Sequence, residues 1–239
     1  MKKLILFTFI LIFSFVLSAQ QDESIFGFQY RPIIPNKFIG EYTHNFDSLP
    51  SFKSSSTQKF GNSFGMVFRH YFLDNVAIES GINFTKRKFD LHFEVDDSLF
   101  KASADTSVAF INYQIPISAL IFVRLSDELF MNASVGINLD FYPSEIGTSK
   151  TIDINNQFIH RGFRTEWIQF GANANFGFEY RTRKKGAFYL GATYNQPLSN
   201  TMRFSMAWKK SGASTVVRDY IKGSFLTLDF RYYLPLDKD

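Results

Sequence analysis

The sequence predicts an all-β fold, a single eight-stranded antiparallel up-and-down transmembrane β-barrel that follows a cleaved signal peptide. Three observations lead to this prediction. Short polar connections alternate with long polar ones, and the segments between them alternate apolar and polar residues with the period of a strand. The N-terminus has the form of an export signal.

The export signal comes first along the chain. Lys2 and Lys3 precede an apolar run over residues 4–17, and Ser18-Ala19-Gln20 follows. A basic start, a short apolar run and small residues before the cleavage position are typical of a secretory signal. The alternative, a membrane-anchoring helix, needs roughly 20 apolar residues. We therefore expect cleavage after Ala19, giving a signal peptide over residues 1–19 and an outer-membrane β-barrel domain over residues 20–239.

Composition limits what was exported. The chain has 239 residues, 30 of them Phe, yet no stretch after the signal is apolar for long enough to form a membrane-spanning helix. The apolar residues must therefore alternate with polar ones, as they do in strands. The net charge of +4, half of it from the two signal lysines, is too small for nucleic-acid binding. The absence of cysteine excludes a lipoprotein and a disulfide-stapled domain.

The connections set the orientation. Short turns are expected at residues 73–75, 125–127 and 182–186, and long loops at residues 36–59, 95–106, 143–163 and 198–221. In outer-membrane barrels the short turns face the periplasm and the long loops face the exterior. Both ends of the barrel domain are therefore expected on the periplasmic side.

Eight segments carry the strand pattern, in the order 26–34, 63–72, 76–87, 111–124, 129–141, 168–181, 188–195 and 226–232. Their apolar faces begin with Phe26, Phe28 and Tyr30; Phe64, Met66, Phe68 and Phe72; Val76, Ile78, Ile82 and Phe84; and Ile111, Tyr113, Ile117, Ile121 and Val123. They continue with Leu129, Met131, Val135, Ile137 and Leu139; Ile168, Phe170, Phe176, Phe178 and Tyr180; Phe188, Leu190, Ala192 and Tyr194; and Leu226, Leu228, Phe230 and Tyr232. Residues 202–208 also alternate, so an extension of the seventh strand's hairpin beyond the membrane stays open.

The three hairpins can be aligned, because opposed side chains share a face of the sheet. Centring the first hairpin on Asp74 pairs Arg69 with Glu79, Phe64 with Phe84 and Phe72 with Val76. Centring the second on Ser126 pairs Ile117 with Val135, Gln114 with Asn138 and Arg124 with Glu128. Centring the third on Lys184 pairs Phe178 with Leu190 and Glu179 with Tyr189. Each alignment sets apolar residues opposite apolar ones.

The composition of the polar face indicates which side is the interior. A soluble lipocalin-like barrel with an apolar interior is the alternative, and its outer face would be rich in Lys and Glu. Here the polar face is mostly Gly, Asn, Ser, Gln and Thr, which suits the narrow interior of an eight-stranded barrel. Aromatic residues near the segment ends are expected to form interfacial girdles, namely Tyr30, Tyr71, Tyr142, Trp167, Tyr180 and Tyr232.

Charged residues of the polar face gather near the short turns. They are expected to form an ionic layer of Arg69, Glu79, Arg124, Glu128, Glu179, Arg181, Asp229 and Arg231. Farther along, the polar positions are neutral amides: Asn83, Gln114, Asn138, Asn173 and Asn195. Opposite charges in a narrow space pair with one another, so we expect a plug, with a gate as the alternative.

Two stretches resemble a known family. The run Tyr113-Gln114-Ile115-Pro116-Ile117, continuing through Arg124 and the turn to residues 130–136, is similar to the core of the small outer-membrane β-barrel domain family described as porin-like or PorT-type. Residues 170–171, 176–180 and 191–195 resemble its later hairpin. The resemblance implies insertion into the outer membrane, with the barrel assembly machinery as a partner, and does not imply transport. Residues 234–239 depart from the terminal aromatic ending common in such proteins.

Few residue groups suggest chemistry. His44, His70, His92 and His160 lie far apart, although His44 with Asp47 and Ser48 would suit an outer-leaflet lipid acyl hydrolase or transferase. Asp96, Asp97 and Asp105 could bind calcium but lack a known loop spacing. Lys209, Lys210, Arg218 and Lys222 could contact lipopolysaccharide phosphates. For each group an ordinary solvated loop is the competing interpretation.

We therefore expect no enzyme, with no catalytic residue, no cofactor and no metal site. The expected role in the cell outer membrane is that of a structural, loop-presented binding or envelope-accessory protein with a filled lumen. Expected partners are outer-membrane lipid, lipopolysaccharide and an unidentified envelope protein or extracellular ligand, and no nucleic acid. A small-solute pore is the alternative, although eight strands leave no open lumen.

Overall fold

The computed structural model describes residues 24–35, 42–46, 49–98, 100–182, 184–210 and 213–235, and their regular structure is β. The expected signal peptide, residues 1–19, lies outside these ranges. Over the ranges given, we find no helix with the length and apolar character needed to cross a membrane, which has no bearing on whether strands do.

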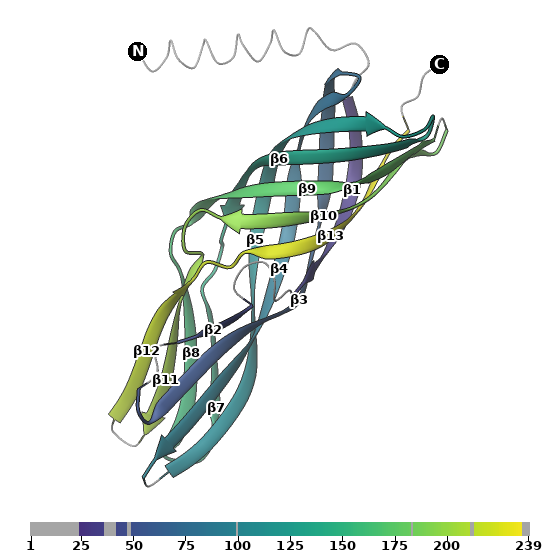
Figure 1. The fold of residues 1–239 in the computed structure, drawn as a ribbon. Helices are drawn as coiled ribbons and strands as arrows, with labels where there is room; N and C mark the ends of the chain where they lie inside the picture. Colours follow the sequence, from purple (N-terminus) through teal and green to yellow (C-terminus); the bar gives the residue numbers. More distant parts are fainter. Residues whose placement is uncertain are drawn as a thin grey trace, which may run out of the picture.

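Eight strands close into a barrel (Figure 1). They are β1 (Ser24–Ile34), β3 (Phe52–Leu73), β4 (Val76–Asp97), β5 (Phe100–Arg124), β6 (Leu129–Phe141), β9 (Ile168–Thr182), β10 (Gly186–Pro197) and β13 (Phe225–Tyr233). Each strand pairs antiparallel with the next in this order, and β13 pairs with β1 to close the ring. The predicted eight-stranded up-and-down barrel is confirmed.

Two of the three predicted hairpin alignments are confirmed. Arg69 faces Glu79 across β3 and β4, and Phe178 faces Leu190 across β9 and β10. Next to the first turn, a register shift between Tyr71 and Leu73 sets Leu73, not Phe72, opposite Val76.

The alignment of the second hairpin is wrong by two residues. Ile117 faces Ile137 instead of Val135, Gln114 faces Asp140 instead of Asn138, and Arg124 faces Phe130 instead of Glu128. The turn sets this register, because the backbone N–H groups of Leu125 and Ser126 both donate to the carbonyl oxygen of Leu129. A shift of two residues keeps every side chain on its face, so the apolar alternation cannot detect it.

The predicted long loops are largely strands. The region 95–106 is a hairpin, since β4 runs to Asp97 and β5 begins at Phe100. Residues 36–59 include the short β2 (Thr43–Asn45) and the start of β3. The other two regions contain β7 (Ile146–Thr151), β8 (Asn156–Arg164), β11 (Met202–Lys210) and β12 (Ala213–Ile221). These form a second sheet of order β12-β11-β8-β7, so residues 202–208 pair with β8 and β12 and do not extend β10.

The second sheet lies beside the far parts of β3, β4 and β5, below the barrel in Figure 1. We call the second sheet, the far parts of β3, β4 and β5, and β2 together the distal sandwich. Its two sheets enclose a hydrophobic core whose buried residues are Phe46, Phe52, Phe89, Leu91, Phe93, Val95, Ala104, Val108, Phe110, Tyr142, Phe158, Met202, Phe204, Met206, Trp208, Val217 and Ile221. A shared apolar core stabilises the sandwich as a folded body.

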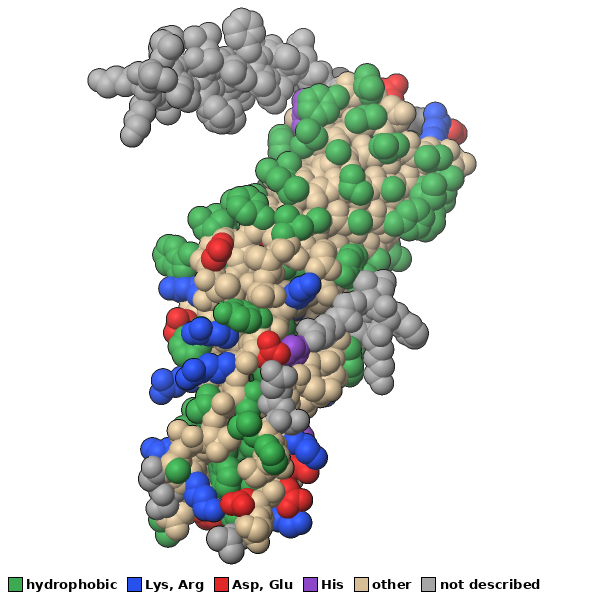
Figure 2. All heavy atoms as spheres, turned by 60° about the vertical axis from the view of Figure 1, so that its left-hand side comes forward, with side chains coloured by type: hydrophobic (Ala, Val, Ile, Leu, Met, Phe, Trp, Pro, Cys, Tyr) green, Lys and Arg blue, Asp and Glu red, His purple; other side chains and the backbone are tan. Residues whose placement is uncertain are grey.

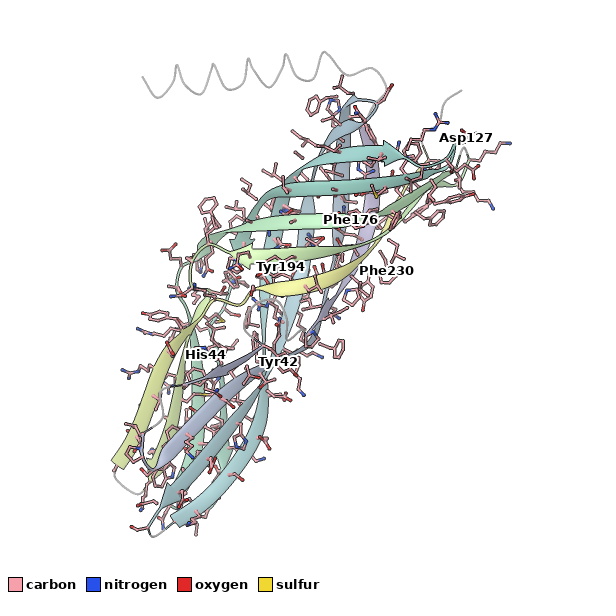
Figure 3. All side chains as sticks on the ribbon, viewed as in Figure 1. Tyr42, His44, Asp127, Phe176, Tyr194 and Phe230 are labelled. Atoms are coloured by element: carbon pink, nitrogen blue, oxygen red, sulfur yellow. The ribbon has the colours of Figure 1, made fainter. Side chains whose placement is uncertain are left out.

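The barrel has the opposite arrangement, with its apolar side chains outside. Figure 2 shows hydrophobic side chains over the barrel and charged ones mostly over the distal sandwich. Figure 3 shows Phe176 and Phe230 on the barrel wall and Tyr194 near the end that meets the sandwich. Polar side chains such as Gln29, Asn83 and Asn112 are buried instead. The soluble lipocalin-like alternative is therefore wrong.

Four of the six expected girdle aromatics face outward. Tyr30, Trp167 and Tyr180 are exposed, and Tyr232 is half-exposed. Two of the six assignments are wrong. Tyr142 is only 3% exposed and belongs to the core of the sandwich, and the Tyr71 hydroxyl accepts a hydrogen bond from buried Arg69 at 3.0 Å.

The apolar wall predicts a cost for a charge in mid-strand. Val135 is 67% exposed on the barrel wall, so Val135→Arg should lower the free energy of unfolding by about 2 to 4 kcal/mol in lipid, because the charge would lie near the bilayer midplane. A urea titration of the protein refolded into vesicles measures this. Ser103→Arg, on the water-facing side of the sandwich, is the control and should change stability by less than roughly 0.5 kcal/mol. Equal small losses at both positions would contradict a lipid-facing wall.

Candidate functional site: the closed lumen and the distal sandwich

Seven charged side chains form one continuous chain inside the turn end of the barrel. In order they are Arg181, Glu179, Arg69, Glu79, Arg231, Asp229 and Arg31, so positive and negative groups alternate. The nitrogen–oxygen distances are 2.7 Å for Arg181–Glu179, 2.6 Å for Arg69–Glu179, 2.9 Å for Arg69–Glu79, 2.7 Å for Arg231–Asp229 and 3.0 Å for Arg31–Asp229. Arg231 also pairs with Glu79. The groups come from β1, β3, β4, β9 and β13, so the chain crosses the lumen.

Arg69 lies at the centre of this chain and is fully buried. Its guanidinium donates to Glu79, Glu179 and the Tyr71 and Tyr233 hydroxyls, and it lies 4.1 Å from the centre of the Tyr233 ring. A buried guanidinium is tolerated when its donors are satisfied and its charge is balanced. Arg69 meets both conditions, because two carboxylates and an aromatic face surround it.

The predicted ionic layer is confirmed for six of its eight members. Arg124 and Glu128 are not part of it. Arg124 pairs with Asp127 at the exposed turn, and Glu128 accepts a hydrogen bond from the exposed Tyr180 hydroxyl. Figure 3 shows Asp127 at the extreme end of the barrel. Both residues lie too close to the turn for their side chains to reach the lumen network.

Arg31 is the member that the sequence analysis missed. It donates to Asp229 at 3.0 Å and to Gln114 and Thr227 at 3.3 Å each. Its place on the polar face of the first segment was visible in the sequence, but the closure of β1 against β13 brings it to Asp229. Asp229 also accepts hydrogen bonds from Asn175 and Thr193, so it links the ionic chain to the neutral part of the lumen.

Amides fill the lumen beyond the charges, as predicted. Asn173 donates to Asn138 at 2.8 Å, and Asn138 donates to Asn195 at 3.1 Å. Asp140 lies among them and accepts from Asn112 and Gln114. A cavity of about 20 Å³, enough for roughly one water molecule, lies where Asn138 and Asn173 meet Glu79 and Arg231 of the ionic chain. Side chains therefore fill the lumen at this level.

Arg87 separates the lumen from the core of the sandwich. Its guanidinium lies 5.4, 5.1 and 4.8 Å from the ring centres of Phe89, Phe110 and Phe225. Gly223 approaches the guanidinium from the side that the three rings leave open. A Cβ atom at this position would lie 2.7 Å from Nη1 of Arg87, and the φ of Gly223 is +75°. The cation is thus held by aromatic faces and a close backbone approach.

The candidate catalytic and metal residues have other partners. His44 binds Asp219 at 2.9 Å, and this contact joins β2 to β12 (Figure 3); Asp47 and Ser48 lie outside the described residues. His70 is hydrogen-bonded to Ser24. Two acids of the calcium candidate pair with cations, Asp96 with Lys101 and Asp97 with Lys210, and the third, Asp105, is hydrogen-bonded to His92. No three potential metal-ligating side chains gather anywhere in the described part of the chain.

The predicted basic cluster divides among three places. Lys209 and Arg218 lie on the outer face of the second sheet, while Lys210 pairs with Asp97 at 3.1 Å. Lys222 follows β12 in the connection to β13. The structure thus keeps two of the four residues together, because neighbouring residues of a strand point to opposite faces.

His160 is buried in the sandwich. Its ring lies 4.5 Å from that of Phe204, and neither ring nitrogen has a hydrogen-bond partner among the described residues. Burial lowers the pKa of His160 to about 4, because the charged imidazolium would lose its hydration. The folded sandwich therefore holds a neutral histidine.

The ionic chain predicts a strong dependence on Arg69. Arg69→Met should lower the free energy of unfolding by about 3 to 5 kcal/mol, because Glu79 and Glu179 would be left buried without their central cation. Chemical unfolding in lipid vesicles gives the value. Adding Glu79→Gln and Glu179→Gln to Arg69→Met should restore part of the loss, and Arg124→Met in the exposed turn should have little effect. A loss in the triple variant as large as the sum of single losses would contradict a coupled network.

His160 predicts acid sensitivity of the sandwich. The unfolded chain binds a proton at the ordinary histidine pKa of 6.5, and the folded sandwich does so only at about 4. Stability is therefore full above pH 6.5 and falls as the pH drops toward 4, by about 3 kcal/mol in total. Hydrogen exchange of the β8 and β11 amides over this range measures it. His160→Leu should flatten the dependence of stability on pH, whereas His92→Leu, at an exposed site, should not change it. An unchanged pH dependence in His160→Leu would contradict the role given to His160.

Comparison with known proteins bears on the fold. Neither a family model nor a curated protein matches the chain. Among solved structures, the outer membrane protein OprG from Pseudomonas aeruginosa is similar, with a TM-score of 0.50 and 9% sequence identity over 90% of this chain and 96% of that one. At this identity the likeness shows the fold alone, and the narrower PorT-type resemblance stays a prediction. The chain has the fold of the small outer-membrane β-barrels.

Proposed function

We propose that the protein is a non-enzymatic outer-membrane barrel with a closed lumen that holds the distal sandwich outside the cell as a binding module. The observation behind this proposal is the hydrophobic core shared by the two sheets of the sandwich. Mobile loops would need no such core. A packed core instead fixes the outer faces of both sheets, and a fixed surface is what recognition by complementary contacts needs.

The topology supports an outward-facing sandwich. All three short turns lie at the barrel end opposite the sandwich, and the described chain begins and ends there, at Ser24 and close to Tyr233. In barrels of this class the short turns face the periplasm and the longer connections face the exterior. The sandwich, built from the longer connections, would then lie outside.

The packing of the lumen argues against the alternative of a small-solute pore. A solute would have to displace the ionic chain around Arg69 and then the amide layer with its cavity of about 20 Å³. Breaking one buried ion pair costs about 3 to 5 kcal/mol. The network therefore supports a plug better than a gate.

The hydrolase alternative depends on His44. In the structure its ring nitrogen Nε2 is 2.9 Å from Asp219, a residue of a strand far along the chain. This contact holds β2 against the edge of the second sheet. A structural role for His44 accounts for the contact, so we propose no catalytic one.

Orientation and closure can be tested on the same protein. The chain has no cysteine, so single-cysteine variants report one position each. Ser149→Cys, on the sandwich, should react with a membrane-impermeant maleimide on intact cells, whereas Asp127→Cys, in a short turn, should react only after the outer membrane is opened. Labelling of Asp127→Cys but not of Ser149→Cys on intact cells would show the opposite orientation.

Closure is tested by single-channel recording in planar bilayers. The wild type should show no stable conductance, because ion pairs and amides fill the lumen. Arg69→Ala should add intermittent openings, since it removes the central cation of the chain. Steady conductance of the wild-type protein would replace the proposal with a pore.

A further inference from the structure

The charged side chains on the outer face of the second sheet are all positive. Side chains that alternate with the buried ones along its four strands are Gly147, Ser149, Thr151, Gln157, Ile159, Arg161, Phe163, Arg203, Ser205, Ala207, Lys209, Ser214, Val216, Arg218 and Tyr220. Arg161, Arg203, Lys209 and Arg218 are all exposed. Over the described lengths of these strands the outward positions contain no Asp or Glu. We call this surface the cationic face.

The four cations have no ion-pair partner among the described residues. Arg203 lies 5.4 Å from the centre of the Phe163 ring, which leaves its charge unbalanced. Asp219, the acid nearest in sequence, points to the other side of β12 and binds His44. The positive charge of this face is therefore available to a ligand.

The outer face of the opposite sheet differs. There Lys59 pairs with Asp90 and Lys101 with Asp96, each at 2.9 Å, and Asp105 is hydrogen-bonded to His92 at 2.7 Å. Both faces belong to the same sandwich and meet the same solvent. Charge is balanced on one face and left unbalanced on the other, so the imbalance is a property of the cationic face and not of the whole surface.

The three arginines form a compact triangle. Ser205 of β11 pairs with Arg161 of β8 on one side and Arg218 of β12 on the other. Strands lie about 4.8 Å apart, so the Cα atoms of Arg161 and Arg218 are roughly 10 Å apart, with Arg203 roughly 8 Å from each. Guanidinium groups at this spacing can bind neighbouring phosphate groups, each through two parallel hydrogen bonds.

An apolar floor runs beside the arginines. Ile159, Phe163, Ala207 and Val216 line an open groove of about 530 Å³ together with the cationic side chains. The ligand that fits such a surface combines anionic groups with apolar or sugar-ring surface. A simple inorganic anion would use the charge and leave the floor uncovered.

The cationic face begins next to the barrel rim. Thr201, one residue before β11, accepts a hydrogen bond through its carbonyl oxygen from Gln169, at 2.9 Å, and Gln169 is the second residue of β9. Arg203 follows two residues later, so it lies within about 7 Å of Thr201 along the strand. Exposed Trp167 marks the same level on the barrel wall. With the sandwich outside the cell, the arginine triangle would therefore lie at the height of the headgroups of the adjoining leaflet.

From these observations we infer that the cationic face binds the phosphate groups of the glycolipid in the outer leaflet, lipopolysaccharide. The inference rests on the proposed function, because it needs the sandwich outside the cell. Arg161, Arg203 and Arg218 would bind the phosphates, and Lys209 would extend the positive surface away from the membrane. Ile159, Ala207 and Val216, which lie beyond the arginines, would contact sugar rings, whereas Phe163, opposite Arg203 at the barrel rim, would face the upper acyl chains.

Native mass spectrometry of the protein in detergent micelles with added phosphorylated lipid A tests the inference. The wild type should retain lipid A, and the variant with Arg161→Gln, Arg203→Gln and Arg218→Gln should bind it roughly tenfold more weakly, because three charge-assisted contacts are lost. Lipid A without phosphates should bind the wild type as weakly as phosphorylated lipid A binds the variant. The matched control removes three lysines from the opposite sheet, Lys53→Gln, Lys59→Gln and Lys88→Gln, and should bind like the wild type.

Equal binding by wild type and arginine variant would overturn the inference, as would equal loss in the lysine control. Binding of a DNA duplex but not of lipid A would indicate a nucleic-acid partner and would also overturn it. These outcomes are separable from failure of the proposed function. Suppose that Ser149→Cys is labelled on intact cells and that the wild type shows no conductance, but that lipid A does not bind. The proposed function then stands, and only the inference about this ligand fails.

Discussion

The buried guanidinium of Arg69 is the interaction on which the closed barrel depends. A barrel of eight strands has an interior just wide enough for side chains, and its lipid-facing wall takes the apolar half of every strand. The interior must then be built from polar groups that satisfy one another. Arg69 allows this, because it bridges Glu79 of β4 and Glu179 of β9, strands on different sides of the ring. Without a central cation these carboxylates would repel each other in a region without bulk water.

Three strands must serve two opposite environments. Along β4 the inward residues are Glu79, Asn83, Thr85 and Arg87 in the barrel and then Phe89, Leu91, Phe93 and Val95 in the sandwich. The outward residues change in the reverse sense, from Ile78, Ile82 and Phe84 to Lys86, Lys88 and Asp90. Along the whole strand the same alternate residues point inward, but the apolar residues are the outward ones in the barrel and the inward ones in the sandwich. This change occurs where lipid ends and water begins, because the hydrophobic effect buries apolar groups away from whichever polar medium is present.

The same change explains what could be predicted from the sequence. Alternation within each membrane segment predicts strand number and faces, and opposite charges at Arg69 and Glu79 predict a lumen pair. The strand predicted from residue 76 ends at Arg87 and the next predicted loop begins at residue 95, so residues 88–94 of β4 carry no prediction; the apolar face changes sides at this point. The run Phe89, Leu91, Phe93 and Val95 alternates with polar residues, so it was a usable signal for a strand that continues past Arg87. The register of the second hairpin and the pairing of Arg31 with Asp229 depend on a turn and on ring closure, which leave no mark in a local pattern.

Where the two interiors meet, the chain must seal a polar lumen against an apolar core. Arg87 meets both requirements, because its charge interacts with Asp140 on the lumen side while its guanidinium faces lie on Phe89, Phe110 and Phe225. Gly223 leaves the space that the guanidinium occupies. A smaller residue would open a cavity between the two interiors, and an apolar residue would remove one of the two cations, Arg87 and Arg31, that interact with Asp140. The seal therefore ties the position of the sandwich to the packing of the lumen, which lets a rigid barrel hold the outer faces of the sandwich in a fixed relation to the membrane.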